Sequence, residues 1–135
     1  MAFYTYNQNN SGGSFDGDNY IIIEADNAAE ANEIAERRTP IYFNGCADGR
    51  DCDCCGDRWY KKNDDWSDAD EAPTIYGLDV TLTDEELLKD ETFLDGLHWF
   101  GMNYSIYYAN GTVVQRHFND EFWTRVDEAK RTRRR

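Results

Sequence analysis

Hydrophobic and polar residues alternate along this chain with two different periods, which predict strands in some segments and helices in others. Aromatic and β-branched runs at residues 3–8 and 74–80 have the composition of strands. Residues 19–25 hold three isoleucines in a row, and this unbroken apolar run predicts a central strand buried on both faces. Residues 104–108 and 112–118 flank an Asn-Gly turn, which predicts a β-hairpin.

Two segments in the first two thirds of the chain carry helical signals. Between residues 27 and 38, alanine and isoleucine recur on one stripe, with Asp26 in position to cap the first turn and Pro40 in position to end the helix. Residues 83–86, Thr-Asp-Glu-Glu, have the form of a capping box and predict a short second helix.

A last helix is predicted near the end of the chain. Asn119 or Asp120 is in position to cap it, and its expected buried side holds Phe122, Trp123 and Val126.

The order of these elements favours a single α+β domain over residues 1–130, with a mainly antiparallel sheet and helices packed on one of its faces. We expect this domain to include a cysteine-rich, zinc-knuckle-like loop at residues 45–60 and a polar, exposed loop at residues 61–72. A basic tail follows at residues 131–135. With 40% hydrophobic and 15% aromatic residues, the 135-residue chain has enough apolar side chains for a core.

Charge is unevenly distributed along the chain. The formal net charge is −13, but residues 1–115 hold 23 acidic and 7 basic residues (−16), whereas residues 116–135 hold 4 and 7 (+3). So acidic a body repels nucleic-acid phosphates and membrane surfaces and favours cationic partners. The basic tail, Lys130–Arg135, is either a solvated helix end or a short arm for nucleic acid or another acidic surface.

The chemical state of the cysteines depends on the compartment in which the protein is found. No apolar run approaches the roughly 20 residues of a membrane span, and the N-terminal residues do not resemble a secretory signal. We therefore expect a cytoplasmic protein whose cysteines are thiolates or metal ligands rather than disulfides.

The cysteine-rich loop has the spacing of half a zinc site. Cys52 and Cys55 form a C-x-x-C motif, in which two thiolates can face one ion, and Gly56 permits the tight turn that follows. Cys46 supplies a third candidate ligand. A thiolate-rich site is usually closed, so we expect the zinc to be structural rather than catalytic.

The fourth zinc ligand is left open by the sequence. Cys54 is close but adjoins Cys55, whereas His98 and His117 are distant in sequence and could approach only through the fold. The alternative is that the four cysteines bind no metal.

A second candidate site combines the polar run after the first strand with the residues after the cysteines. Amides, a hydroxyl and an Arg beside an aromatic ring could hold a nucleotide. The residues proposed for this ligand site are Asn7, Asn9, Asn10, Ser11, Arg58 and Trp59. The competing interpretation is a plain turn, with Trp59 in the core and Arg58 paired with an aspartate.

The sequence holds no motif that identifies a catalytic site. His98 and His117 are the only histidines, both stand beside aromatic residues, and no local pattern selects a Cys/His/Asp set. We therefore do not expect an enzyme, and a metal-dependent enzyme is kept as an alternative.

Three passages of the first half carry a resemblance. FYTYNQNNSGGSF, YIIIEADNAAEANEIAE and IYFNGCADGRDCDCCGDRWY resemble a family of small uncharacterised proteins encoded mainly by bacteriophages. The second half shares only a strand near residues 75–77 and a late Tyr-Tyr-x-Asn-Gly hairpin. Similar proteins often have proline where this chain has Asp53, which makes its cysteine turn less pre-organised.

The resemblance implies a phage accessory protein that acts in the cytoplasm of a bacterial host. From it we expect a non-enzymatic protein that binds a host factor, such as a nuclease, a polymerase or a defence component. The acidic body of the chain could compete for a basic surface of that host factor, one that otherwise binds nucleic acid. The alternative function is sequestration of a nucleotide or another small signal that acts in host defence.

Overall fold

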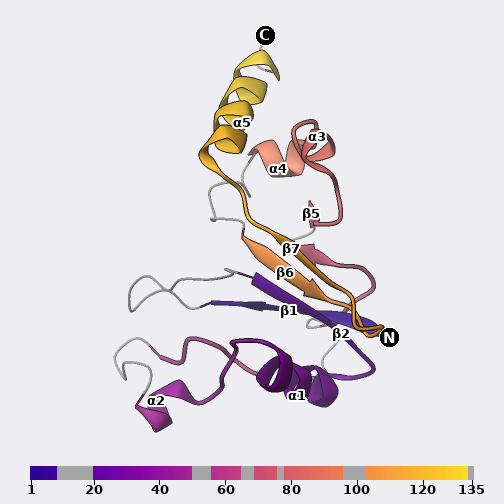
Figure 1. The fold of residues 1–135 in the computed structure, drawn as a ribbon, viewed down its shortest axis with the longest axis vertical. Helices are drawn as coiled ribbons and strands as arrows, with labels where there is room; N and C mark the ends of the chain where they lie inside the picture. Colours follow the sequence, from indigo (N-terminus) through magenta and orange to yellow (C-terminus); the bar gives the residue numbers. More distant parts are fainter. Residues whose placement is uncertain (9–19, 50–55, 65–68, 76–77, 96–102, 134–135) are drawn as a thin grey trace.

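The computed structural model describes residues 1–8, 20–49, 56–64, 69–75, 78–95 and 103–133, and Figure 1 shows them as a mixed sheet with helices at both ends of an elongated molecule. The fold is α+β, as predicted. The sheet has the strand order β3-β1-β2-β6-β7, in which only β2 and β6 are parallel. Its strands are β1 (Ala2–Asn7), β2 (Tyr20–Ala25), β3 (Ala69–Asp70), β6 (Tyr104–Tyr107) and β7 (Val113–Arg116).

The isoleucine run lies in the middle of this sheet, as its lack of polar positions predicted. β2 pairs with β1 on one side and with β6 on the other. Because alternate residues of a strand face opposite sides, Ile21 and Ile23 belong to one buried cluster and Ile22 to another. The sheet therefore needs a cover on each face.

The first cover is α1 (Ala28–Arg38), whose buried alanines pack beneath the sheet. Its N-cap is Asn27, whose side-chain oxygen accepts from the Glu30 amide at 2.8 Å, so the prediction of Asp26 was wrong by one residue. Thr39 caps the other end, directly before Pro40.

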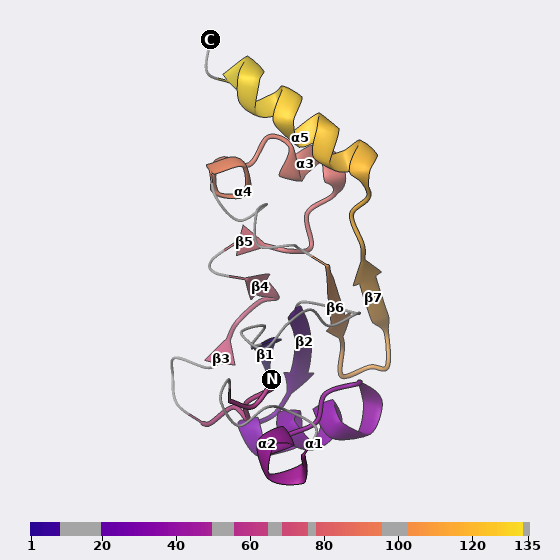
Figure 2. The same ribbon diagram turned by 90° about the vertical axis from the view of Figure 1, so that its left-hand side faces the viewer.

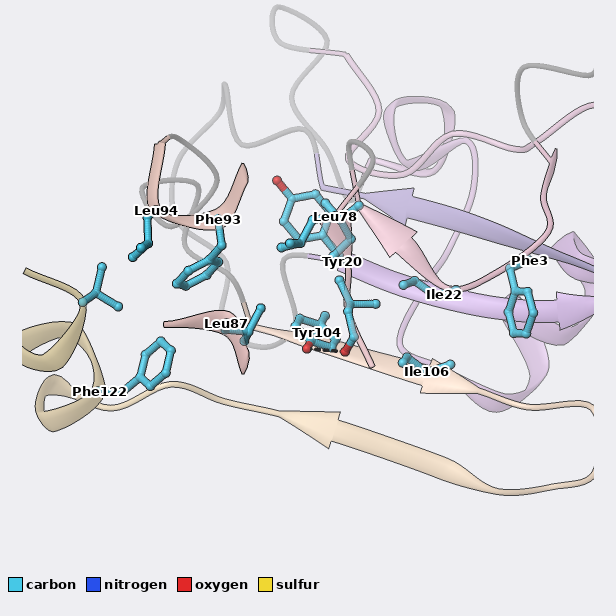
Figure 3. Close-up of a cluster of buried hydrophobic side chains, with 13 residues drawn as sticks. Phe3, Tyr20, Ile22, Leu78, Leu87, Phe93, Leu94, Tyr104, Ile106 and Phe122 are labelled. Atoms are coloured by element: carbon cyan, nitrogen blue, oxygen red, sulfur yellow. Dashed lines mark hydrogen bonds between the residues drawn. The ribbon is translucent and has the colours of Figure 1, made fainter. Parts of the chain in front are cut away.

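The second cover lies on the opposite face and at the far end of the sheet. Figure 3 shows Ile22, Tyr104 and Ile106 of the sheet with apolar residues from three helices and a small hairpin. These elements are β4 (Thr74–Ile75), β5 (Leu78–Asp79), α3 (Asp84–Leu87), α4 (Glu91–Asp95) and α5 (Asp120–Arg133). The prediction of helices on one face only was therefore wrong, because a sheet with a strand buried on both sides requires apolar cover on both.

Several local predictions also need correction. The expected loop at residues 61–72 holds β3, which pairs with Phe3 and Tyr4 of β1. The expected strand at residues 74–80 is instead the antiparallel pair β4 and β5. The sequence also did not predict the helix α4, which holds Phe93 and Leu94 of the core.

Other local predictions are confirmed. Thr83 and Glu86 form both bonds of a capping box at the start of α3. The β6–β7 hairpin closes around Asn110 and Gly111. The side chain of Asn119 accepts from the Phe122 amide at 2.9 Å and caps α5. Within the described residues, none of the helices has the length and apolar content that a membrane span requires.

Candidate functional site

The cysteine-rich segment begins in a short helix that the sequence did not predict, α2 (Gly45–Asp48). Asn44 precedes it at φ 58°, and Gly49 ends it at φ 79°. Cys46 lies in this turn and is half-buried, and its amide donates to Oδ1 of Asp57 at 2.9 Å. This bond holds the two ends of the cysteine-rich segment together.

The turn expected after the C-x-x-C motif is partly visible. Gly56 has φ 84°, the left-handed conformation that glycine adopts without steric cost. Cys52, Cys54 and Cys55 lie outside the described residues, so the zinc site stays a prediction. Among the residues that the structure describes, no three His, Cys, Asp or Glu side chains gather as a metal site would require.

The two candidate histidines differ in what can be said of them. His98 lies outside the described residues. His117 is exposed between β7 and α5, and Figures 1 and 2 show this junction between the sheet and α5, with α2 on the other side of the sheet. The structure therefore does not bring His117 to Cys46.

The segment after the cysteines is joined to α1 by hydrogen bonds of two side chains, Asn32 and Asp64. Asn32 accepts from the Tyr6 hydroxyl at 2.7 Å and from the Lys62 amide at 2.9 Å, and it donates to the Lys62 carbonyl at 3.0 Å. Oδ1 of Asp64 accepts from the Ala28 amide at 2.7 Å, one turn away. These bonds fix the residues that follow the cysteines beneath β1.

Arg58 and Trp59 of the predicted ligand site differ in how deeply they are buried. Arg58 is half-buried and donates from Nη1 to Oε1 of Gln8 at 3.2 Å. Trp59 is only 1% exposed and packs in the cluster beneath the sheet, so its ring offers no face for a base to stack on. Asn7 is exposed at the end of β1, and the remaining residues of this site, Asn9, Asn10 and Ser11, lie outside the described residues.

A surface that the sequence did not indicate lies along β7. This strand has a described neighbour, β6, on one side only, and Figure 2 shows it at the outer edge of the sheet. Val113 and Val114 are 41% and 37% exposed, although valine is usually buried. The signal that was available is composition, because residues 112–115 form a β-favouring run without charge or proline.

The hydrogen bonds of the hairpin show which backbone groups of β7 face outward. The Tyr108 amide donates to the Thr112 carbonyl at 2.9 Å, so this is a hydrogen-bonded pair of the antiparallel ladder. Bonded and non-bonded pairs alternate, so Val114 directs its N–H and C=O to β6. Those of Val113 and Gln115 consequently point away from the sheet.

A group of charged residues joins the end of β7 to α3 and α5. Arg116 forms an ion pair with Asp84 and donates from Nη1 to the Leu82 carbonyl at 2.8 Å. Arg125 pairs with Glu85, and this guanidinium lowers the pKa of the Glu85 carboxyl. Both pairs are at least partly exposed, so they orient the elements more than they stabilise them.

Comparison with known proteins gives one result. No curated protein and no solved structure matches the chain. The model of a family described as Domain of unknown function (DUF7296) matches residues 1–123, and the chain belongs to this family.

Proposed function

We propose that this chain is a non-enzymatic phage accessory protein that binds and modulates a host bacterial protein, and that the outer edge of β7 is the contact. The observation that carries this proposal is the outward backbone of Val113 and Gln115 beside two exposed valines. An extended segment of a partner can add to such an edge as a further strand, in which main-chain hydrogen bonds give affinity. The valine side chains would then contact the partner on the two faces of the enlarged sheet.

The charge of the chain supports a cationic partner. At a net charge of −13, the protein attracts basic surfaces over long range and speeds their encounter. Three consecutive exposed acidic residues, Asp84–Glu86, lie in α3 near the Arg116 end of β7, although Asp84 and Glu85 are each already paired with an arginine. A host protein whose basic surface binds nucleic acid has the complementary charge, so the acidic chain would compete with its nucleic acid.

The nucleotide-binding alternative has narrower support. The Gln8–Arg58 hydrogen bond places one guanidinium group at the end of β1, and a guanidinium is a common ligand of anions. The burial of Trp59 removes the stacking surface that this alternative relied on. The alternative of a metal-dependent enzyme depends on cysteines outside the described residues and stays a prediction.

The test of the proposal uses one position and two substitutions. Gln115→Pro removes an outward N–H without touching the ladder to β6, because proline is tolerated where the N–H of an edge strand faces solvent. Gln115→Ala removes the same side chain and keeps the N–H, so it is the matched control. Each protein is immobilised, exposed to a bacterial lysate, and its captured proteins are identified by mass spectrometry.

We expect one cationic host protein to be captured by the wild-type chain and by Gln115→Ala, and lost with Gln115→Pro. Capture should weaken as the salt concentration rises, because the attraction between opposite charges is screened. Equal capture by both variants would place the contact away from β7, and capture that is insensitive to salt would contradict the electrostatic part of the proposal.

A further inference from the structure

The helix α5 has a second surface that the proposed contact at β7 does not use. An open groove of about 480 Å³ runs between α5 and the segment of α3 and α4. Its apolar residues are Leu88, Leu94 and Ala129, and its α5 side also presents Arg125, Glu128 and Thr132. The groove therefore combines apolar residues with charged ones on both sides, because Lys89 lines it opposite α5.

The α5 side of this groove follows helical spacing. Positions 121, 125, 128 and 132 are separated by four, three and four residues, so they form one stripe along α5. Along this stripe Glu121 is followed by Arg125 and then by Glu128. The first turn of α5 holds Asp120 and Glu121, and its last residues include Lys130, Arg131 and Arg133.

Such a stripe is complementary to itself when two helices run antiparallel. If Arg125 of one copy lies opposite Glu128 of another, two-fold symmetry places Glu128 of the first opposite Arg125 of the second. The same register sets the acidic first turn of each helix beside the basic last turn of its partner. The macrodipoles of the two helices are then also antiparallel, which is favourable.

We propose that the groove beside α5 receives α5 of a second copy of this chain, in an antiparallel and two-fold symmetric pairing. The existing Arg125–Glu85 pair is compatible with this, because a guanidinium has five N–H donors and one carboxylate occupies only part of them. Figures 1 and 2 place α5 at one end of the elongated molecule, with α1 and α2 at the other end. Charge complementarity along α5 thus favours a second copy although each chain carries a net charge of −13.

The experiment measures the mass of the full chain by light scattering after gel filtration, over loading concentrations up to about 1 mM, where weak pairing becomes visible. We expect the mass to rise with concentration from 15.7 kDa toward twice that value. Glu128→Arg should raise the dissociation constant of the dimer at least about tenfold, because it places two arginines opposite each other. Adding Arg125→Glu to this variant reverses both charges and should restore pairing.

The control is Asp127→Arg, which changes the charge by the same amount at an exposed position off the stripe. A wild-type chain that keeps the mass of one copy at every concentration would overturn the proposal. So would equal weakening by Glu128→Arg and Asp127→Arg, or a double variant that does not restore pairing while its thermal unfolding shows it to be folded. Gln115→Pro should leave self-association unchanged, which separates this proposal from the contact at β7.

Discussion

The buried hydroxyl of Tyr104 donates to the carbonyl of Val80 at 2.6 Å and ties the sheet to the segment that leads into α3. Burial raises the pKa of this phenol from 10.0 to about 12. The folded protein therefore keeps a proton that the unfolded chain loses above about pH 10, so stability must fall as the pH rises from 10 to 12. The expected loss attributable to Tyr104 reaches about 2 kcal/mol at pH 12.

Urea unfolding at pH values from 8 to about 12 measures this loss, with Tyr104→Phe as the comparison. The variant should be less stable at neutral pH, because the Val80 carbonyl loses its donor, but its stability should fall less steeply with pH. Equal slopes in the two proteins would show that Tyr104 is not responsible.

An aromatic cluster fixes the start of α5 to the rest of the molecule. The ring of Phe122 stacks on Phe118 with centroids 4.5 Å apart, and it also contacts Phe93 and Trp123. We predict that Phe122→Ala lowers the free energy of unfolding by about 3–5 kcal/mol, because it leaves a cavity in this cluster. Phe122→Leu keeps most of the volume and should cost clearly less. A loss below about 1 kcal/mol for the alanine variant in urea unfolding would contradict the prediction.

The capping box of α3 gives a smaller and local prediction. Oγ1 of Thr83 accepts from the Glu86 amide at 3.2 Å, and Oε1 of Glu86 accepts from the Thr83 amide at 3.2 Å. Thr83→Ala should therefore destabilise the protein by about 1 kcal/mol, while Thr83→Ser keeps the acceptor and should cost only a few tenths. Thermal unfolding of the two variants beside the wild type measures the difference.

The zinc prediction can be tested by elemental analysis of protein purified without added metal. We expect about one zinc per chain, as in a closed structural site. Cys52→Ser should lose the metal and destabilise the protein, whereas Cys54→Ser should retain the metal if Cys54 is the cysteine that the site does not need. A folded, metal-free protein with four titratable thiols would contradict the prediction.

The sequence predicted elements best where a period or a local side-chain bond decides the structure. The isoleucines of β2, the alanine stripe of α1 and the capping box at Thr83 each specify their element within a few residues. The sequence did not predict elements that are too short to show a hydrophobic period. α2 has four residues and β3 has two, and β3 exists because β1 offers it hydrogen bonds.

The candidate surfaces were harder to predict for a related reason. Whether a valine-rich strand is central or lies at an edge depends on the order of strands, and the sequence of β7 alone does not contain that order. Trp59 shows the opposite case, because an aromatic residue beside Arg58 suggested a binding site and the fold buries it beneath the sheet. The groove beside α5 likewise requires α4 to be placed against α5, which no local pattern indicates.

The parallel pairing of β2 with β6 has a consequence for the synthesis of the chain. Ile22 pairs with Ile106, which leaves the ribosome 84 positions later (22 against 106). At a translation rate of 5–20 residues per second, this interval is roughly 4–17 s. During it β1 and β2 can form a hairpin, while one edge of the isoleucine strand has no partner in the nascent chain. The isoleucine strand of this acidic protein thus cannot complete its pairing until the last third of the sequence has been synthesised.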